Sequence, residues 1–325
     1  MTRFELVPRG PFSLAASAAF LEGFAPAAHR GAEPGHLHLA FVPDGEEAAA
    51  GVCLRQPDTN VVGEAFGDAD PAAVRDQVAR ILSLDVDGSG FPEVGRRDQV
   101  VGELQDRWPG LRPVGFFSPY EAAAWTLMVQ RIRIVQAARI KDRMAAELGQ
   151  AVDVHGDLRH AFPGPARLAG LDGFPGLTAR KVGYLQSLGR AAMAGRLDTA
   201  RLRALPREQA LAWLKELDGV GDFSAELVLL RGAGDPDHLP VHEPLLRRAV
   251  ALAYGLDGPP DEARLAELAE AWRPYRTWVV LLLRVLLEET TGEVRGTRGS
   301  PRAQATRPSS EAVARPAWRG TTRTE

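Results

Sequence analysis

The stretch that decides the fold is residues 217–250, LDGVGDFSAELVLLRGAGDPDHLPVHEPLLRRAV. It begins with the two-glycine segment at residues 217–221, which predicts a tight turn between two helices because glycine adopts backbone conformations closed to other residues. An apolar run at helical spacing follows, then a loop rich in Gly, Pro and Asp that leads to Glu243 and a further helix. This order predicts that the Glu243 carboxylate returns to the side of the glycine turn.

The glycine turn is also suited to a phosphate group. Gly219, Val220 and Gly221 precede a helix whose free N–H groups and dipole favour negative charge. Asp222 is expected to cap that helix.

Length and composition restrict the class of protein. A chain of 325 residues is long enough for two or three domains. Cys53 is its only cysteine, which excludes an intramolecular disulfide and a cysteine-ligated iron–sulfur cluster. The sequence has no apolar run of membrane-spanning length and its first residues lack the apolar core of a signal peptide, so we expect a cytoplasmic protein.

Charge is distributed unevenly along the chain. Within a formal net charge of -3, acidic residues outnumber basic ones in residues 1–110 and basic residues outnumber acidic ones in the remainder. This asymmetry predicts a local basic face on the second part of the chain, although uneven scatter of surface charge is the alternative.

Residues 1–112 are predicted to form an α+β domain. Alternating apolar residues predict strands at residues 4–7, 36–42, 50–54 and 61–65. Helices are expected at residues 13–24, capped by Ser13, and after the Asp70-Pro71 pair. His36 and His38 share one strand face and could be metal ligands, but no third ligand is evident nearby, so we interpret them as a solvated face. Residues 84–115 are interpreted as a link between domains.

Residues 113–289 are predicted to be nearly all helical. A capping box at Ser118 and Glu121, with a proline between them, starts the first helix. A second glycine-punctuated turn lies at residues 171–176. Residues 290–325 are rich in Gly, Pro, Ser, Thr and Arg, which predicts a disordered basic tail that adds non-specific attraction to phosphates.

Five separated blocks resemble the AlkA-type DNA-3-methyladenine glycosylase II family of the helix-hairpin-helix (HhH-GPD) superfamily. They are residues 106–121, residues 129–130 with 137–138, the hairpin at 217–230, residues 239–240 with Glu243, and residues 269–278. The resemblance covers about residues 3–290. It implies an N-terminal α+β domain similar to half of a TATA-binding protein, followed by an all-α helix-hairpin-helix glycosylase domain.

The chemistry that the resemblance implies is base excision. The hairpin grips one DNA strand and a damaged nucleotide is flipped into a pocket. A carboxylate then stabilises the oxocarbenium-like sugar and orients water. The family uses an Asp, and the matched position here is Glu243. A first-turn glutamate that serves only the helix dipole is the alternative, and Asp235 and Asp237 are substitute acids to consider.

The resemblance also assigns binding residues. For DNA contact it implies the hairpin residues Gly219, Val220 and Gly221 and the wedge position at Gln130 and Arg131. Arg131 and Arg133 on a solvated helix face are the alternative. Independently, Arg180 and Lys181 follow the glycine turn at residue 176, which favours phosphate contact, and His242 precedes Glu243, where it could cap the helix or contact phosphate. Arg247, Arg248, Arg273 and Arg276 are weaker candidates for phosphate contact. Leu227 and Arg284 stand where the family would place two pocket aromatics. The expected base pocket consists of Trp125, Phe223, Leu227 and Trp278, with core packing as the alternative for the three aromatics and a solvent- or phosphate-facing side chain as the alternative for Arg284.

Cofactors and partners follow from the same resemblance. No organic cofactor is expected, and the carbonyls of Gly219 and Gly221 would hold a monovalent cation, Na⁺ or K⁺. Phe223 occupies the place of the Schiff-base lysine of bifunctional relatives, which implies a monofunctional enzyme. The implied partner is double-stranded DNA with damaged bases, bound by a monomer in the cytoplasm at the nucleoid, away from membranes. The alternatives are a non-catalytic damaged-DNA-binding protein and a glycosylase for a bulkier alkyl lesion.

Overall fold

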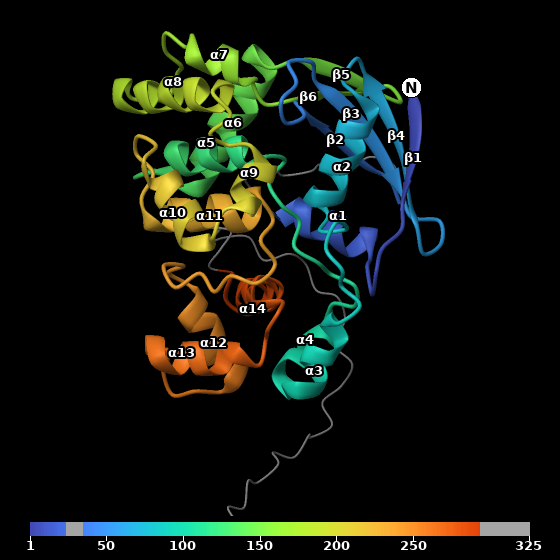
Figure 1. The fold of residues 1–325 in the computed structure, drawn as a ribbon, viewed down its shortest axis with the longest axis vertical. Coiled ribbons are helices and arrows are strands. Elements are labelled where there is room, and N and C mark those ends of the chain that lie inside the picture. Colours follow the sequence, from blue (N-terminus) through green and yellow to red (C-terminus); the bar gives the residue numbers. More distant parts are fainter. Residues whose placement is uncertain (24–34, 293–325) are drawn as a thin grey trace, which may run out of the picture.

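The computed structural model describes residues 1–23 and 35–292 and combines one antiparallel sheet with a larger helical part (Figure 1). The sheet lies on one side of the molecule, and helices from the middle of the chain lie on the other. A second, two-stranded sheet lies at one end of the molecule, and the helices near the end of the chain lie toward the opposite end.

The N-terminal sheet confirms the strands predicted from alternation. It contains β1 (Thr2–Leu6), β2 (Leu37–Phe41), β3 (Ala50–Arg55) and β4 (Val61–Gly67), in the antiparallel order β1-β4-β3-β2. Helices α1 (Leu14–Gly23) and α2 (Pro71–Ile81) cover it, with leucines of α1 and valines of α2 in its core. As predicted, α2 starts after Asp70, whose carboxylate accepts hydrogen bonds from the N–H groups of Ala72 and Ala73.

Two helices lie where a linker was expected. They are α3 (Phe91–Arg97) and α4 (Gln99–Arg107), and their apolar residues pack into the same core as the last helices of the chain. The linker interpretation of residues 84–115 is therefore wrong over these helices. Both are short, so their helicity depends on tertiary packing more than on a sequence pattern.

A small hairpin interrupts the part that was predicted to be nearly all helical. Strands β5 (Ala151–Val154) and β6 (Asp157–His160) pair with each other and pack beside β2 and β3. His155 at the hairpin tip contacts the N-terminal sheet, because its Nε2 lies 2.8 Å from the carboxylate of Glu64. Strands of four residues carry too little pattern to be predicted, and two strands need such a partner to be stable.

The remaining elements are helical. They are α5 (Pro119–Val129), α6 (Ile134–Leu148), α7 (Pro165–Ala169), α8 (Ala179–Met193), α9 (Thr199–Ala204), α10 (Arg207–Lys215), α11 (Asp222–Leu227), the π-helix η2 (Val228–Gly232), α12 (Leu246–Tyr254), α13 (Glu262–Glu270) and α14 (Arg276–Thr291). Helix α14 includes residues 290 and 291, which were assigned to the tail. The rest of the predicted tail, from residue 293, lies outside the described residues.

Helix α5 is the centre of the helical part, since ten of its eleven residues are buried. Ser118 caps it as predicted, accepting a hydrogen bond from the N–H of Glu121 at 3.1 Å. The other half of the predicted capping box is wrong, because the Glu121 carboxylate pairs instead with Lys141 of α6 at 3.2 Å. Burial raises the pKa of Glu121, and the Lys141 ammonium opposes that rise.

The apolar residues form three main cores. One lies under the N-terminal sheet, one surrounds α5, and one joins α3 and α4 to α12, α13 and α14. The boundary between residues 112 and 113 stays a prediction. Among the described residues, no helix has the length and apolar character that crossing a membrane requires.

The close approach of η2 to α5 gives a stability prediction. A Cβ on Gly232 would lie 2.7 Å from Cα of Pro119, so Gly232→Ala is expected to lower the free energy of unfolding by about 1–3 kcal/mol. The matched control is Gly183→Ala within α8, where an added Cβ meets nothing within 4 Å. That change should stabilise by roughly 0.5–1 kcal/mol. Urea unfolding measures both, and equal effects would contradict the packing argument.

Candidate active site

A cavity of about 470 Å³ lies where α1, α5, α11 and α14 meet. Most of its wall is apolar or aromatic, with rings from five different segments: Phe20, Trp108, Phe116, Trp125 and Phe223. Four carboxylates and two guanidinium groups interrupt that wall: Glu226, Glu243, Glu288, Glu289, Arg231 and Arg284. An apolar pocket with a few convergent charged groups is typical of a small-molecule or base-binding site.

Three of the four predicted pocket residues line this cavity. Trp125 and Leu227 form part of its wall, and Phe223, 38% exposed, stands at its edge. The prediction for Trp278 is wrong. Its indole is 2% exposed and packs against Phe91 and under the guanidinium of Arg112, away from the cavity. The pocket side of α14 instead presents Thr277, Val280, Leu281 and Arg284.

Glu243 reaches the cavity from the segment before α12. Its Oε1 accepts a hydrogen bond from the N–H of Leu245 at 3.3 Å and pairs with the guanidinium of Arg284. The side chain is only 18% exposed. Glu243 therefore does contact an N–H near the start of α12, as the alternative interpretation held, and it also faces the cavity.

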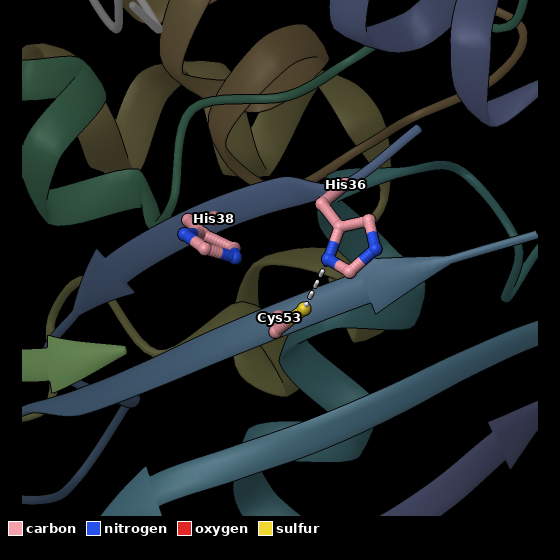
Figure 2. Close-up of side chains that lie close together, drawn as sticks. All are labelled: His36, His38 and Cys53. Atoms are coloured by element: carbon pink, nitrogen blue, oxygen red, sulfur yellow. Dashed lines mark hydrogen bonds between the residues drawn. The ribbon is translucent and has the colours of Figure 1, made fainter. Parts of the chain in front are cut away.

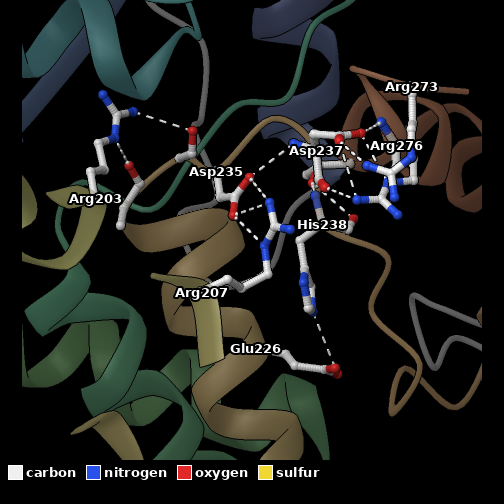
Figure 3. Close-up of polar contacts among 11 residues, drawn as sticks. Arg203, Arg207, Glu226, Asp235, Asp237, His238, Arg273 and Arg276 are labelled. Atoms are coloured by element: carbon white, nitrogen blue, oxygen red, sulfur yellow. Dashed lines mark hydrogen bonds and ion pairs between the residues drawn. The ribbon is translucent and has the colours of Figure 1, made fainter. Parts of the chain in front are cut away.

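The substitute acids Asp235 and Asp237 do not line the cavity; they fix the loop before Glu243 (Figure 3). Asp235 accepts two hydrogen bonds from Arg207, at 2.9 and 3.1 Å. Asp237 accepts from Arg276 at 2.9 Å and from Arg273 at 3.1 Å. Both carboxylates are thus engaged in ion pairs. The same pairs engage Arg273 and Arg276, so the prediction that Arg276, which is buried, contacts phosphate is wrong.

Glu226 of α11 is a cavity residue that the sequence analysis missed. Its carboxylate is 4% exposed and lies 3.3 Å from Nε2 of His238 and 3.0 Å from Nδ1 of His242. Burial acts to raise its pKa, but the contacts with the two histidines outweigh burial and lower it. One feature of the sequence could have revealed it: Glu226 lies at helical spacing between Phe223 and Leu230, so it falls on the apolar side of the helix.

Arg231 of η2 brings positive charge to the same wall. Its Nη2 donates to the carbonyl of Val114 at 2.5 Å, and its guanidinium lies 5.4 Å from the centre of the Phe20 ring. Burial and the nearby charge of Arg284 lower its pKa to about 10, while Glu243 opposes that shift. Arg231 therefore stays charged at neutral pH and balances the cavity carboxylates.

The hairpin turn has the geometry that its glycines predict. Gly219 has φ +80°, and an added Cβ would lie 2.8 Å from the ring of Tyr184. Its carbonyl accepts a hydrogen bond from Nε2 of Gln130 at 2.9 Å, and that of Gly221 accepts from the N–H of Ala225. The prediction that Asp222 caps α11 is wrong.

The residue before α11 is Gly221, and the Asp222 carboxylate instead pairs with Lys215 at 2.8 Å. That pair ties the start of α11 to the end of α10. The charge of Asp222 is thereby partly neutralised beside the turn.

Arg131 lies in the turn between α5 and α6, at φ +57°, with an exposed side chain. The alternative of a helix face is therefore wrong for Arg131, and Arg133 is likewise the residue before α6. Ile134 and Val135, which begin α6, are 40% and 38% exposed. This turn thus presents a cation and two apolar side chains beside the cavity, because Ile134 also lines its edge.

Arg180 and Lys181 differ in what they can contact. Lys181 is buried and its Nζ donates to the carbonyl of Met128 at 2.6 Å, so the prediction that it contacts phosphate is wrong. Burial also lowers its pKa. Arg180 is exposed and donates to the hydroxyl of Tyr184 at 2.8 Å. Because Tyr184 packs on Gly219, Arg180 flanks the hairpin turn.

Comparison with known proteins gives similar sequences that are named as DNA repair enzymes. No family model matches the sequence. It is 29% identical over 280 residues to the probable bifunctional transcriptional activator/DNA repair enzyme AlkA of Mycobacterium tuberculosis, covering 80% of this chain and 55% of that protein. It is 24% identical over 206 residues to the DNA-3-methyladenine glycosylase of Bacillus subtilis, covering 62% and 68%.

The fold agrees with these relatives. The 3-methyladenine DNA-glycosylase from Archaeoglobus fulgidus superposes with a TM-score of 0.72 and 23% identity, over 90% of this chain and 99% of that one. The chain is thus similar in sequence and fold to AlkA-type DNA-3-methyladenine glycosylases. It spans little more than half the length of the Mycobacterium tuberculosis relative. In this chain, the hairpin turn, the turn between α5 and α6 and the cavity are neighbours.

The contacts of Glu226 predict a pH-dependent contribution to stability. Because its pKa is lowered on folding, the ionised carboxylate stabilises the native state above its ordinary pKa of 4.5, and that contribution is lost as the pH falls through the lowered value. Glu226→Gln should cost on the order of 1.5 kcal/mol at pH 7.

Urea unfolding at pH 7 and below pH 4.5 tests this prediction. The difference between the variant and the unchanged protein should shrink at the lower pH. The control is Glu208→Gln, an exposed position whose effect should stay within about 0.5 kcal/mol. A difference that grows as the pH falls would contradict the assignment.

Proposed function

We propose that this chain is a monofunctional DNA glycosylase that excises alkylated bases of the 3-methyladenine type from DNA. It would flip the damaged nucleotide out of the duplex and hydrolyse its N-glycosidic bond, as the first step of base excision repair. The observation that carries the proposal is the Glu243 carboxylate, 18% exposed, in the wall of an aromatic-lined cavity of a chain similar to AlkA-type glycosylases. The names of its relatives support the same activity.

The cavity can supply the two interactions that the reaction needs. Trp125 and Phe223 offer ring faces on which a cationic alkylated base would stack. Glu243 offers a carboxylate that would stabilise positive charge on the sugar as the bond to the base breaks, and would orient the attacking water. Its carboxylate is paired with the guanidinium of Arg284 in the cavity wall.

Arg284 also bears on the choice of lesion. A guanidinium in the pocket wall repels a cationic base, and Glu243 offsets that repulsion only when it is not fully neutralised by the pair. A glycosylase for a bulkier, less charged alkyl lesion is therefore the second candidate within the same enzyme class. The observation that favours it is this ion pair.

DNA would be bound through the surface beside the cavity mouth. The hairpin at residues 219–221 would contact one strand's phosphates, with Arg180 at its flank and the half-exposed His242 nearby. Arg131 would fill the gap left by the flipped base, by stacking as well as by charge.

The same proposal covers cofactors, partner and location. No organic cofactor is needed, and a monovalent cation would use the second lone pairs of the Gly219 and Gly221 carbonyls, each of which accepts one hydrogen bond already. The protein would act as a monomer on double-stranded DNA, in the cytoplasm at the nucleoid. Its N-terminal sheet would correspond to the half-TATA-binding-protein domain of the family.

A non-catalytic damaged-DNA-binding protein is less well supported. That function would require no carboxylate in the pocket, whereas Glu243 faces a largely apolar cavity. Burying a carboxylate in such a place costs free energy, which a binding role gives no reason to retain.

Release of 3-methyladenine and 7-methylguanine from methylated duplex DNA tests the proposal. The unchanged protein should release base without cutting the strand, and Glu243→Gln should lower the single-turnover rate by about 10²-fold or more, because the replacement is uncharged. Glu267→Gln, an exposed change on α13 away from the cavity, is the control and should keep the full rate.

The remaining outcomes separate the alternatives. Release that is gained only in Glu243→Asp would mean that the longer side chain has tuned the enzyme to another lesion. DNA binding without release of either base by the unchanged protein, by Glu243→Gln or by Glu243→Asp would refute the proposed activity.

The wedge role of Arg131 gives a separate prediction. Arg131→Ala should lower the rate of base release about tenfold, equivalent to ~1.4 kcal/mol, because the vacated gap in the duplex is no longer filled. Fluorescence of 2-aminopurine beside the lesion would report the loss of flipping. The matched control is Arg133→Ala, which removes an exposed cation two residues away whose side chain makes no capping hydrogen bond to α6. Equal losses in both variants would indicate general charge attraction instead.

A further inference from the structure

A cluster of potential metal ligands lies between β2 and β3, outside the cavity (Figure 2). His38 and Cys53 are directly opposite each other in the antiparallel pair, and His36 precedes β2 on the same face as His38. One ligand atom from each residue lies within 4.8 Å of the other two, and Nδ1 of His36 is 3.5 Å from Sγ of Cys53. The third ligand that the sequence did not reveal thus comes from the neighbouring strand.

The interpretation of the two histidines as a solvated face is wrong. His38 is 6% exposed and Cys53 is fully buried. The cause is the β5–β6 hairpin, which packs beside β2 and β3 and places Asp157 against His38. Alternation along β2 alone could not show that a hairpin more than a hundred residues later covers this face.

His38 is oriented as a ligand. Its Nδ1 lies 2.9 Å from Oδ2 of Asp157, which is itself held by Arg159. Its Nε2 is buried and has no hydrogen-bond partner in the part of the chain that the structure describes. A histidine that donates one ring nitrogen to a carboxylate keeps the other as a lone-pair donor, which is the arrangement found behind metal-bound histidines. A buried ring nitrogen without a partner is otherwise unfavourable.

The donor set indicates the metal. Two imidazole nitrogens and one thiolate suit Zn²⁺, whose bonds of about 2.0–2.1 Å to nitrogen and about 2.3 Å to sulfur place such ligands roughly 3.6 Å apart in a tetrahedron. The His36–Cys53 separation is already close to that value. Glu64, opposite Cys53 on β4, is held by Arg55 at 2.9 Å and His155 at 2.8 Å, so the described residues offer three ligands.

We propose that His36, His38 and Cys53 bind a structural zinc ion. The ion would join β2 to β3 and, through Asp157, join the sheet to the β5–β6 hairpin of the helical part. None of these residues lines the cavity, so the ion stabilises the contact between the two parts of the chain and takes no part in base excision.

The decisive experiment uses the untagged full chain. Elemental analysis of protein purified without chelators should find about one zinc per chain. After removal of the metal, Co²⁺ should produce a thiolate-to-cobalt charge-transfer absorption band. Because Cys53 is the only cysteine, such a band in the unchanged protein can arise at this site alone. Stripping the metal should lower the melting temperature, and Zn²⁺ but not Mg²⁺ should restore it.

Matched variants give a second measurement. Cys53→Ala and His38→Gln should lose bound zinc, and Cys53→Ala should also lose the cobalt band, whereas His160→Gln, an exposed histidine on β6, should keep both. Circular dichroism shows whether each variant folds. If the variants fail to fold, the cobalt band of the unchanged protein still decides. Purified protein that holds no zinc and gives no thiolate–cobalt band would overturn the proposal, leaving a hydrogen-bonded His–Cys pair.

Discussion

The burial of α5 on all sides is the constraint on which the site depends. A helix with no exposed face must be surrounded, and here η2 and α8 pack on it closely, with Gly232 against its first turn. Its C-terminal end is then fixed from two directions. Lys181 of α8 donates to the carbonyl of Met128, and Gln130 donates to the carbonyl of Gly219 in the hairpin. The turn between α5 and α6, the hairpin turn and α8 are therefore held together by hydrogen bonds to backbone carbonyls around one helix end.

A second set of interactions holds the loop that positions Glu243. The loop between η2 and Glu243 has little regular structure, and four arginines from distant segments hold it. Arg203 binds the carbonyl of Ala233, Arg207 binds Asp235, and Arg276 binds Asp237. Charge-assisted bonds of this kind are stronger than neutral ones and, where an arginine uses two donors, fix orientation as well. The acids of this loop are thus anchors, and the acid that follows it is left to face the cavity.

Charge balance explains how Glu226 and Glu243 coexist in the cavity wall. Glu243 pairs with Arg284, and Glu226 contacts His238 and His242. Arg231 adds a further buried positive charge near Glu243. Both carboxylates are thereby compensated, which the low polarity of the surrounding aromatic wall requires. Glu226 and the histidines also connect α11 to the loop, so the hairpin and the acid-bearing segment share one electrostatic network.

The sequence by itself determined the local elements and the order of the motifs. Strands β1 to β4, the Asp70 cap and the helical hairpin follow from alternation, capping chemistry and glycine, all of which act within a few residues. It also supplied Trp125, Phe223, Leu227 and Glu243, because their positions match a family pattern. The sequence did not predict the partners of these side chains. Trp278, Lys181 and Arg276 have the right chemistry for the assigned roles, but packing buries them.

Only the tertiary structure decided those partners, because burial and pairing arise between segments far apart in the chain. Such long-range contacts place Glu226 in the cavity wall. They also bring His36 and His38 close to Cys53 under the β5–β6 hairpin.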